Sequence, residues 1–413
     1  MDIIIGGGMT GLSFARFDKG HDYTILEKDS TLGGYSRTTL RNGFVWDYSG
    51  HFFHFQDPEI EAMIAAHMRA EDILNISKVT HIKYKDRLVD FPFQKNIHQL
   101  DKEELIDCLY DLFTAPTGEY HNFQEMLYCK FGKSIAEKFL IPYNAKLYAC
   151  DLNTLDKDAM GRFFPYAEKE DIVRNFRHSH NGSYNGSFVY PKGGAIQYVN
   201  SIASGIPQEC IRKNSEVHGI NPKAHTVTLK DGTTLHYDRL VSSMPFPLLM
   251  KATGLPHNAD VFTWNQVLVF NLGFDSKGPN TIDNWIYFPE GKYCFYRVGF
   301  YDNILGQNRT SLYVELGFSK DDIVHPEGWK QRVLDDLVAA GVTDPRQKLV
   351  DCETIIMNPA YVHINQKSMD EVEKQKEVLA GYDIYSIGRY GSWTYCSIED
   401  NIKEARALAA WLH

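Results

Sequence analysis

The stretch "IIIGGGMTG", residues 3–11, decides how the start of this chain is interpreted. Its isoleucines predict a short buried strand, and its glycines fit the spacing G-x-G-x-x-G. We expect a helix to about Phe17 and a second strand over residues 23–26 that ends at Glu27. In such a unit the backbone approaches a pyrophosphate at the helix N-terminus, and the acidic residue accepts ribose hydroxyls. The spacing alone is a weak signal, but strand, helix and acid together predict a dinucleotide-binding unit.

A second glycine-rich segment, "LGGYSRT" over residues 32–38, follows closely. A glycine pair with Arg37 just beyond the acidic residue lets backbone and guanidinium close on another part of the same cofactor. This extension resembles flavoproteins of the amine-oxidase and protoporphyrinogen-oxidase superfamily, which bind FAD, more than nicotinamide dehydrogenases. A glycine turn with a surface arginine is the alternative. The expected cofactor contacts in the two segments are Gly6, Gly8, Met9, Thr10, Gly11, Glu27, Lys28, Gly33, Gly34, Ser36 and Arg37.

Composition limits the classes of function. A chain of 413 residues is longer than one compact core usually holds, so about two or three domains are expected. The net charge of −10 provides no basic surface for nucleic acid, and any anionic substrate needs a local arginine cluster. No apolar stretch reaches the ~18 residues of a membrane span. The seven cysteines include no C-x-x-C pair and the first residues lack a signal peptide's basic region, so a reduced, cytoplasmic protein is expected. A homo-oligomer is left open.

The order of predicted elements indicates an α/β fold in three parts. Residues 58–78 and 101–149 have helical apolar spacing, and residues 264–318 alternate as strands do. A strand and a helix over residues 383–413 are expected to return to the first unit. We therefore expect a discontinuous Rossmann-like FAD-binding domain, a helical insert domain and an antiparallel β-sheet substrate domain. Their expected boundaries are, in that order, residues 1–78 with 186–240 and 380–413, residues 98–185, and residues 79–97 with 241–379.

Further motifs follow in order along the chain. They cover Gly50-His51 and residues 91–97, 142–148, 185–194, 284–289, 295–297 and 388–395. The ordered set resembles the UDP-galactopyranose mutase family, flavoenzymes that interconvert pyranose and furanose nucleotide sugars. The individual pieces are short, but together they span most of the chain.

Two arginines are central to the site that this resemblance implies. A diphosphate is best held by guanidinium groups from two directions, and Arg297 and Arg389 come from different segments, each among aromatic residues. Either arginine alone could instead belong to a structural ion pair, and aromatic residues in strands are mostly core. The resemblance makes Arg297, Arg389 and His51 catalytic and places His51 beside the flavin ring.

The same resemblance implies the substrate contacts. Phe91 and Phe93 would stack on a flat base while the Gln94 amide reads its edge, and Arg162 is an approximate counterpart of a loop arginine that reaches the diphosphate. The expected substrate contacts are Phe91, Phe93, Gln94, Asn144, Tyr148, Arg162, Asn185, Tyr287, Tyr361 and Tyr395. The expected cofactor contacts near the C-terminus are Gly388, Asp400, Asn401 and Ile402.

The implied reaction requires reduced FAD but causes no net oxidation. Flavin N5 attacks the anomeric carbon, UDP leaves, the flavin-sugar adduct opens and recloses in the other ring size, and UDP returns. The expected partners are a UDP-sugar, most simply UDP-galactopyranose or UDP-galactofuranose of cell-surface polysaccharide synthesis, and a reductant for the flavin. The sequence has no metal-ligand spacing and no Ser-His-Asp set.

Two alternatives stay open. An FAD-dependent oxidase or desaturase of the amine-oxidase superfamily would have an apolar substrate tunnel and no paired arginines at the flavin. A mutase homologue that binds a nucleotide sugar without turnover is the other. Tyr148 stands where the mutases more often have tryptophan, and Glu399 where they have asparagine. We therefore expect Glu399 to influence which substrate is accepted.

Overall fold

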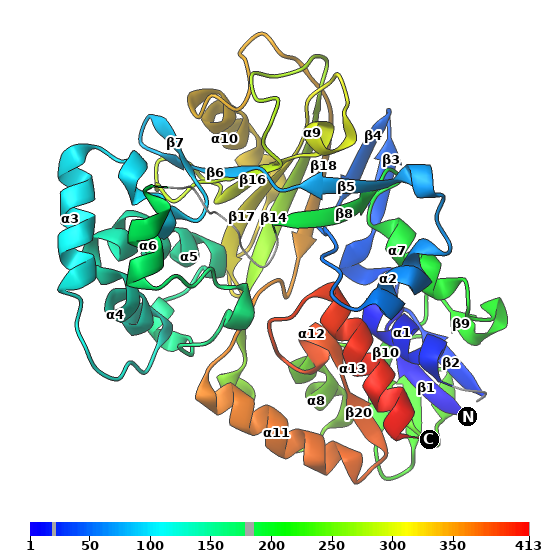
Figure 1. The fold of residues 1–413 in the computed structure, drawn as a ribbon. Coiled ribbons are helices and arrows are strands. Elements are labelled where there is room, and N and C mark those ends of the chain that lie inside the picture. The colour runs from blue at the N-terminus through cyan, green and yellow to red at the C-terminus, as the bar shows by residue number, and fades with distance from the viewer. Residues whose placement is uncertain (19–21, 178–185, 413) are drawn as a thin grey trace.

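A computed structural model of the chain describes residues 1–18, 22–177 and 186–412 (Figure 1). Three parts are visible: a parallel sheet with its helices, a large mainly antiparallel sheet, and a group of helices on the far side of that second sheet. The chain passes between these parts repeatedly, so residues far apart in sequence meet at their junction.

The parallel sheet has five strands in the order β20-β13-β1-β2-β9. Every neighbouring pair in it is parallel. The strands are β1 (Asp2–Ile5), β2 (Tyr23–Leu26), β9 (Ile211–Arg212), β13 (Leu240–Ser242) and β20 (Ile384–Ser386). The prediction that the last strand and helix return to the first unit is confirmed, since β20 pairs with β13.

Both faces of this sheet are covered, which explains why its strands are apolar throughout. Ile4 packs on one face among residues of α1 (Met9–Phe17), α7 (Ile196–Ala203) and α13 (Ile398–Trp411). Ile3 and Ile5 pack on the other face against the three-stranded sheet β10 (Val217–Asn221), β11 (Thr226–Leu229) and β12 (Thr234–His236), and against α8 (Phe246–Thr253). The period-2 alternation of the isoleucines therefore separates two cores.

The large sheet runs β18-β14-β17-β16-β15-β6-β7, with β19 (Val362–His363) beside β14. Its strands are β6 (Thr80–Tyr84), β7 (Arg87–Asp90), β14 (Thr263–Phe274), β15 (Trp285–Tyr287), β16 (Arg297–Phe300), β17 (Ser311–Ser319) and β18 (Leu349–Met357). All pairs are antiparallel except β15 with β6. Helix α10 (Pro326–Ala339) packs its Val333 and Leu337 on one face.

The helical part contains α3 (Lys102–Phe113), α4 (Phe123–Ile135), a π-helical turn over Ala136–Leu140, α5 (Ile141–Tyr148) and α6 (Lys169–Asn175). Their apolar faces share one core with Ile82 and Val89 of the neighbouring hairpin. α5 reaches the large sheet, where Asn265 Nδ2 donates a 2.5 Å hydrogen bond to the carbonyl of Leu147. This contact brings the helices against the sheet.

Smaller elements complete the molecule: the pairs β3 (Thr38–Arg41) with β4 (Phe44–Asp47) and β5 (Ile73–Ser77) with β8 (Ser187–Pro191), and helices α2 (Pro58–Ala65), α9 (Tyr301–Leu305), α11 (Gln366–Ala380) and α12 (Gly388–Gly391).

The prediction of a helix over residues 58–78 is wrong in its second half. Helix α2 ends at Ala65, and residues 73–77 form strand β5 because they pair with β8, more than a hundred residues later. Among the described helices, none combines the length and apolar character that a bilayer crossing requires.

Candidate functional site

A cavity of about 650 Å³ lies where the helical part meets the large sheet. The helices contribute Tyr143, Asn144 and Leu147, and the sheet contributes Tyr287, Arg297 and Tyr313. Segments 50–54, 91–95 and 160–166 form the rest of the wall together with Tyr361 and Tyr395. More than half of the lining residues are aromatic, and tyrosines are the commonest among them, so the cavity suits a ligand with both flat and polar parts.

Arg297 already has a carboxylate partner. It stands opposite Glu315 across β16 and β17, and its Nε and Nη2 reach that carboxylate at 2.5 and 2.8 Å. Burial by itself lowers the pKa of Arg297, but Glu315 outweighs it, and the pKa lies well above its ordinary value. Glu315 also accepts a hydrogen bond from Ser49 Oγ. No sequence motif indicates Glu315, because its pairing with Arg297 depends on strand register.

Arg389, at the start of α12, lies in an aromatic cage. Its guanidinium carbon lies 4.6 Å from the ring centre of Tyr395, 5.3 Å from that of Tyr361 and 5.9 Å from that of Tyr390. Its Nε is buried without a hydrogen-bond partner, and within the described residues it pairs with no carboxylate. A partly buried cation without a counter-ion is costly unless an anion arrives to pair with it. Two of the caging tyrosines line the cavity.

His51 lies close enough to the two arginines to be influenced by them. Burial lowers the pKa of His51 to about 4, and Arg389 and Arg297 act in the same direction while Glu315 opposes them. The imidazole is therefore neutral near pH 7. Its buried Nδ1 has no hydrogen-bond partner among the residues that the structure describes.

The segment predicted to stack on a base has only one ring in the cavity wall. Phe91 lines the cavity and lies 5.2 Å from Tyr287, centroid to centroid. Phe93 is fully buried and stacks on Phe139 at 5.2 Å, so it belongs to the helical core and does not reach the wall. Its role as a stacking partner is corrected accordingly.

Gln94 is also fully buried, and its Nε2 donates to the carbonyl of Pro165. Gln94 therefore fixes the 160–166 segment and does not line the cavity. Lys95, which the sequence did not single out, lies in the wall instead. Consecutive residues here point in different directions, and no local pattern indicates which of them faces the ligand.

Asn144 and Tyr148 lie on the same helix but differ in access. Asn144 lines the cavity; its Nδ2 donates to Leu140 at 2.7 Å, and its buried Oδ1 has no partner, so it is a ready acceptor. Tyr148 is 1% exposed, lies behind Tyr361 with ring centres 5.8 Å apart, and is not part of the wall. Asn185, another expected contact, lies outside the described residues.

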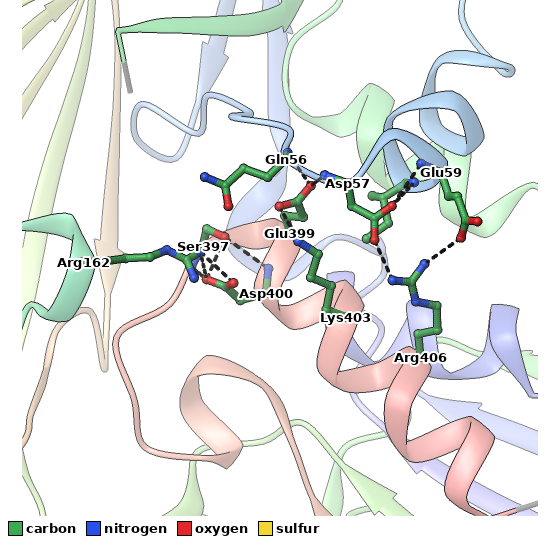
Figure 2. A network of polar contacts seen from close by, with 10 residues as sticks. Gln56, Asp57, Glu59, Arg162, Ser397, Glu399, Asp400, Lys403 and Arg406 are labelled. Atoms are coloured by element: carbon green, nitrogen blue, oxygen red, sulfur yellow. Dashed lines mark hydrogen bonds and ion pairs between the residues drawn. The ribbon is translucent and has the colours of Figure 1, made fainter. Parts of the chain in front are cut away.

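Arg162 forms a contact that the sequence did not predict (Figure 2). Its Nη2 lies 2.7 Å from both carboxylate oxygens of Asp400 near the start of α13. The neighbouring Phe163 ring meets Tyr395 edge-on at 5.2 Å. Burial raises the pKa of Asp400, but its hydrogen bonds with Arg162 and Ser397 prevail and lower it. The 160–166 segment is thus attached to the start of α13.

Glu399 is not part of the cavity wall, so the expected influence on substrate choice has no direct ligand contact to act through. It is 1% exposed, and its Oε1 accepts hydrogen bonds of 2.8 Å from the backbone N–H groups of Gln56 and Asp57. Its Oε2 pairs with Lys403 at 2.9 Å (Figure 2). Glu399 therefore joins the loop before α2 to α13.

The glycine-rich segment fits a flavin dinucleotide. Helix α1 begins at Gly8 without a side-chain cap, so its first N–H groups are free for a pyrophosphate. Glu27 is 5% exposed and accepts a 2.7 Å hydrogen bond from Gly7 N–H, which places the carboxylate beside the loop. Gly8 and Gly34 face each other, since a Cβ on Gly34 would lie 3.6 Å from the Gly8 Cα. Met9, Thr10, Gly11, Gly33 and Ser36 lie around this cradle, whereas Lys28 is exposed.

Asn401 connects the cradle to the arginine cage. Its Oδ1 accepts from Thr10 Oγ1 at 3.0 Å and from the backbone N–H of Arg389 at 2.7 Å. Gly388 has φ +85°, and a Cβ there would lie 2.4 Å from Thr10 Oγ1, so only glycine fits. Ile402 is fully buried in the core around Ile4 and supports the site from behind.

Arg37 secures the second glycine segment. It pairs with Asp29 at 2.8 Å and donates to the carbonyls of Leu32 and Thr31. Within the described residues no cluster of histidine, cysteine, aspartate and glutamate has the arrangement of a metal site.

The parallel sheet, glycine cradle and buried cavity define a flavin-dependent enzyme class. The chain belongs to the flavin-containing amine oxidoreductase family, which matches residues 9–352. The structure of reduced UDP-galactopyranose mutase superposes with a TM-score of 0.93 at 25% identity and covers 100% of this chain and 95% of that one. The resemblance to that mutase and the expected fold class are thereby confirmed.

Curated relatives include oxidases. Coproporphyrinogen III oxidase of Staphylococcus aureus (strain NCTC 8325 / PS 47) is 23% identical over 66% of this chain and 67% of its own length. Chloroplastic protoporphyrinogen oxidase 1 of Arabidopsis thaliana is 22% identical over 39% of this chain. The chain spans only about a third of the length of the plant enzyme, with 33% covered. The matched proteins thus include a mutase and oxidases, and the reaction of this chain must be inferred from its site.

Proposed function

We propose that this protein is an FAD-dependent nucleotide-sugar mutase that interconverts UDP-galactopyranose and UDP-galactofuranose or a closely related pair. The main support is Arg389, a partly buried guanidinium without a carboxylate partner among the described residues, beside a cavity lined with tyrosines. A diphosphate supplies the missing negative charge. An uncharged or cationic amine substrate does not.

The residues of the cavity have separate tasks in this proposal. Arg389 binds the diphosphate and stabilises the charge that grows on it as the sugar–phosphate bond breaks. Arg297, held by Glu315, orients the same group through its remaining N–H donors. Phe91 stacks on the base at the far wall, and Asn144 Oδ1 accepts from a sugar or base donor.

The flavin is proposed to be FAD in its reduced form, which supplies the nucleophile for the anomeric carbon of the sugar. The α1 N-terminus, Glu27 and Arg37 hold its dinucleotide part, and the neutral His51 lies on the side of the two arginines. Tyr361 and Tyr395 close the sugar end of the cavity.

The rival function, an oxidase of the same family, requires a different cavity. It predicts an apolar tunnel without paired arginines near the flavin, whereas the wall here contains Arg297, Lys95 and several tyrosines. The second alternative, a non-catalytic nucleotide-sugar binder, shares the whole cavity with the mutase and differs from it only in turnover.

One experiment separates the three functions. The flavin-loaded protein is reduced anaerobically with dithionite, UDP-galactofuranose is added, and conversion to UDP-galactopyranose is followed by chromatography. We expect conversion with reduced flavin only. If UDP binds but is not accompanied by conversion in either redox state, the protein is the non-catalytic binder. If UDP does not bind and no conversion occurs, the nucleotide-sugar site is rejected.

A further inference from the structure

The ammonium group of Lys146 is enclosed by four backbone carbonyl oxygens. Its Nζ lies 2.9 Å from the oxygen of Phe288, 3.1 Å from that of Glu290, 3.0 Å from that of Tyr293 and 2.5 Å from that of Phe295. It forms no ion pair with a carboxylate of the residues that the structure describes. Convergent carbonyl oxygens are also how proteins bind monovalent metal ions.

All four carbonyls belong to one loop, residues 288–296, which joins two residues of the cavity wall. The loop leaves β15 just after Tyr287 and enters β16 at Arg297. Lys146 itself projects from α5, whose Asn144 lies in the opposite wall. A single ammonium group therefore connects the helical wall of the cavity to the sheet wall.

The attachment of α5 to the sheet does not depend on this lysine side chain. Asn265 of β14 donates a hydrogen bond from Nδ2 to the carbonyl of Leu147, and β17 approaches so closely that a Cβ on Gly317 would lie 2.2 Å from the Lys146 carbonyl oxygen. The loop has another attachment on its far side, where Cys294 N–H donates to Asp336 of α10 at 2.8 Å. Loss of the ammonium would thus release the cavity side of the loop and leave the helix in place.

We propose that Lys146 is a positioning residue that acts as a built-in monovalent cation. By gathering the four carbonyls, it sets the places of Tyr287 and Arg297 relative to Asn144, and hence the width of the cavity. Its removal leaves a carbonyl cage that accepts K⁺, Rb⁺ or ammonium. The effect on nucleotide binding rests on the proposed function, whereas the cage chemistry does not.

The first test measures UDP affinity of the flavin-loaded protein for Lys146→Ala, Lys146→Met and the control Lys133→Ala, an exposed lysine of α4. We expect Lys146→Ala to weaken UDP binding about tenfold to a hundredfold while the flavin content and absorbance spectrum stay unchanged. Ammonium or K⁺ should restore the affinity of Lys146→Ala, and sodium salt at equal ionic strength should restore less. In Lys146→Met the methionine side chain occupies the cage, so this variant should bind UDP weakly in every salt. Unchanged affinity in both variants would overturn the proposal.

The second test is a crystal structure of Lys146→Ala grown with and without RbCl. We expect anomalous Rb⁺ density among the four carbonyls, and a shift of Tyr287 and Arg297 in the crystal without it. An empty cage in RbCl, or an unmoved loop in its absence, overturns the inference. If the wild type binds no UDP, the proposed function fails, but the crystal structures of Lys146→Ala still decide the role of Lys146. If Lys146→Ala does not fold, the crystal structure of Lys146→Met is determined instead, and it must show a displaced 288–296 loop. A 288–296 loop in its wild-type position in that structure also overturns the inference.

Discussion

Two arginines in one site differ in how their charges are compensated. Arg297 shares a buried ion pair with Glu315, whereas Arg389 lies among aromatic rings, donates to the carbonyl of Cys396 at 3.4 Å and pairs with no carboxylate of the described residues. Aromatic rings stabilise a guanidinium more weakly than a carboxylate does. We therefore expect substitution of Arg389 to reduce activity and substitution of Arg297 to reduce stability. Comparing the two variants then separates function from stability.

Arg389→Ala should abolish most activity without unfolding the protein. Removing a donor that acts on the transition state lowers kcat by about 10²–10³ in comparable sites. Flavin should stay bound, because Asn401 holds the backbone at residue 389 and not its side chain. Steady-state kinetics and the flavin absorbance spectrum are the measurements. Arg346→Ala, an arginine on the surface, is the control. Near-normal kcat in Arg389→Ala would refute the diphosphate assignment.

Arg297→Ala should instead destabilise the fold. It leaves Glu315, which is 1% exposed, as a buried charge without its partner, and breaking a buried pair on one side costs about 3–5 kcal/mol. The thermal midpoint should fall well below that of Arg389→Ala. Arg297→Ala combined with Glu315→Gln should recover part of the loss. Equal midpoints for the two single variants would contradict this account of the charges.

At the scale of elements, side chains join segments that are distant in sequence. Glu399 fixes the loop before α2 to α13, Arg162 attaches the 160–166 segment to the start of the same helix, and Arg406 pairs with Asp57 about two turns further on (Figure 2). α13 thus collects contacts from both the helical part and the flavin part. Its N-terminal half is the junction between them.

Glu399→Ala should cost stability but leave nucleotide preference unchanged. Two backbone donors lose their acceptor, which typically costs about 1–3 kcal/mol, while the cavity wall is untouched. Glu399→Gln keeps an oxygen acceptor and should cost less. The thermal midpoint tests the first part, and the ratio of affinities for UDP and other nucleoside diphosphates tests the second. A changed ratio would return Glu399 to the substrate site.

Local spacing predicted the elements that depend on local sequence. The glycine loop, its helix and Glu27 follow from residues within one β-α-β unit. The apolar spacing of residues 58–78 predicts a helix through strand β5, because local spacing carries no information about the long-range pairing of β5 with β8. The carbonyl cage of Lys146 has no sequence pattern at all, since backbone oxygens carry no residue identity.

The same limit applies to the site. Sequence motifs located Arg297, Arg389, Phe91 and Asn144 near the cavity, but they could not tell Phe91 in the wall from Phe93 in the core, two positions apart. The partners Glu315 and Asp400 were missed because each meets its arginine only after distant segments are packed. Resemblance to a family finds the segments, and packing decides which side chains face the ligand.

For the whole molecule, one buried carboxylate predicts a pH effect. Asp47 accepts from Thr38 Oγ1, Tyr190 Oη and Ala195 N–H, and so joins three segments. Burial raises its pKa to about 6 despite these hydrogen bonds. The native state therefore binds this proton more tightly than the unfolded state, and the contribution of Asp47 to stability falls as pH rises from about 4 to about 6.

Asp47→Asn removes that titration and retains an oxygen acceptor. The thermal midpoint of the variant relative to the wild type should rise between pH 4 and pH 6 and then stay level. Scanning fluorimetry across that range measures the difference. A difference that is independent of pH would show that Asp47 is ionised throughout.

The place of β20 in the parallel sheet has a consequence for biosynthesis. The sheet that cradles the cofactor begins with β1 at residue 2 and is completed at its edge by residues 384–386, and α13 follows. A ribosome makes the first strand long before the last one, so β1 cannot be joined through β13 to β20 until residues 384–386 have been synthesised. Until α13 has also been made and has docked, the glycine loop lacks the hydrogen bond between Thr10 and Asn401 that links it to Arg389.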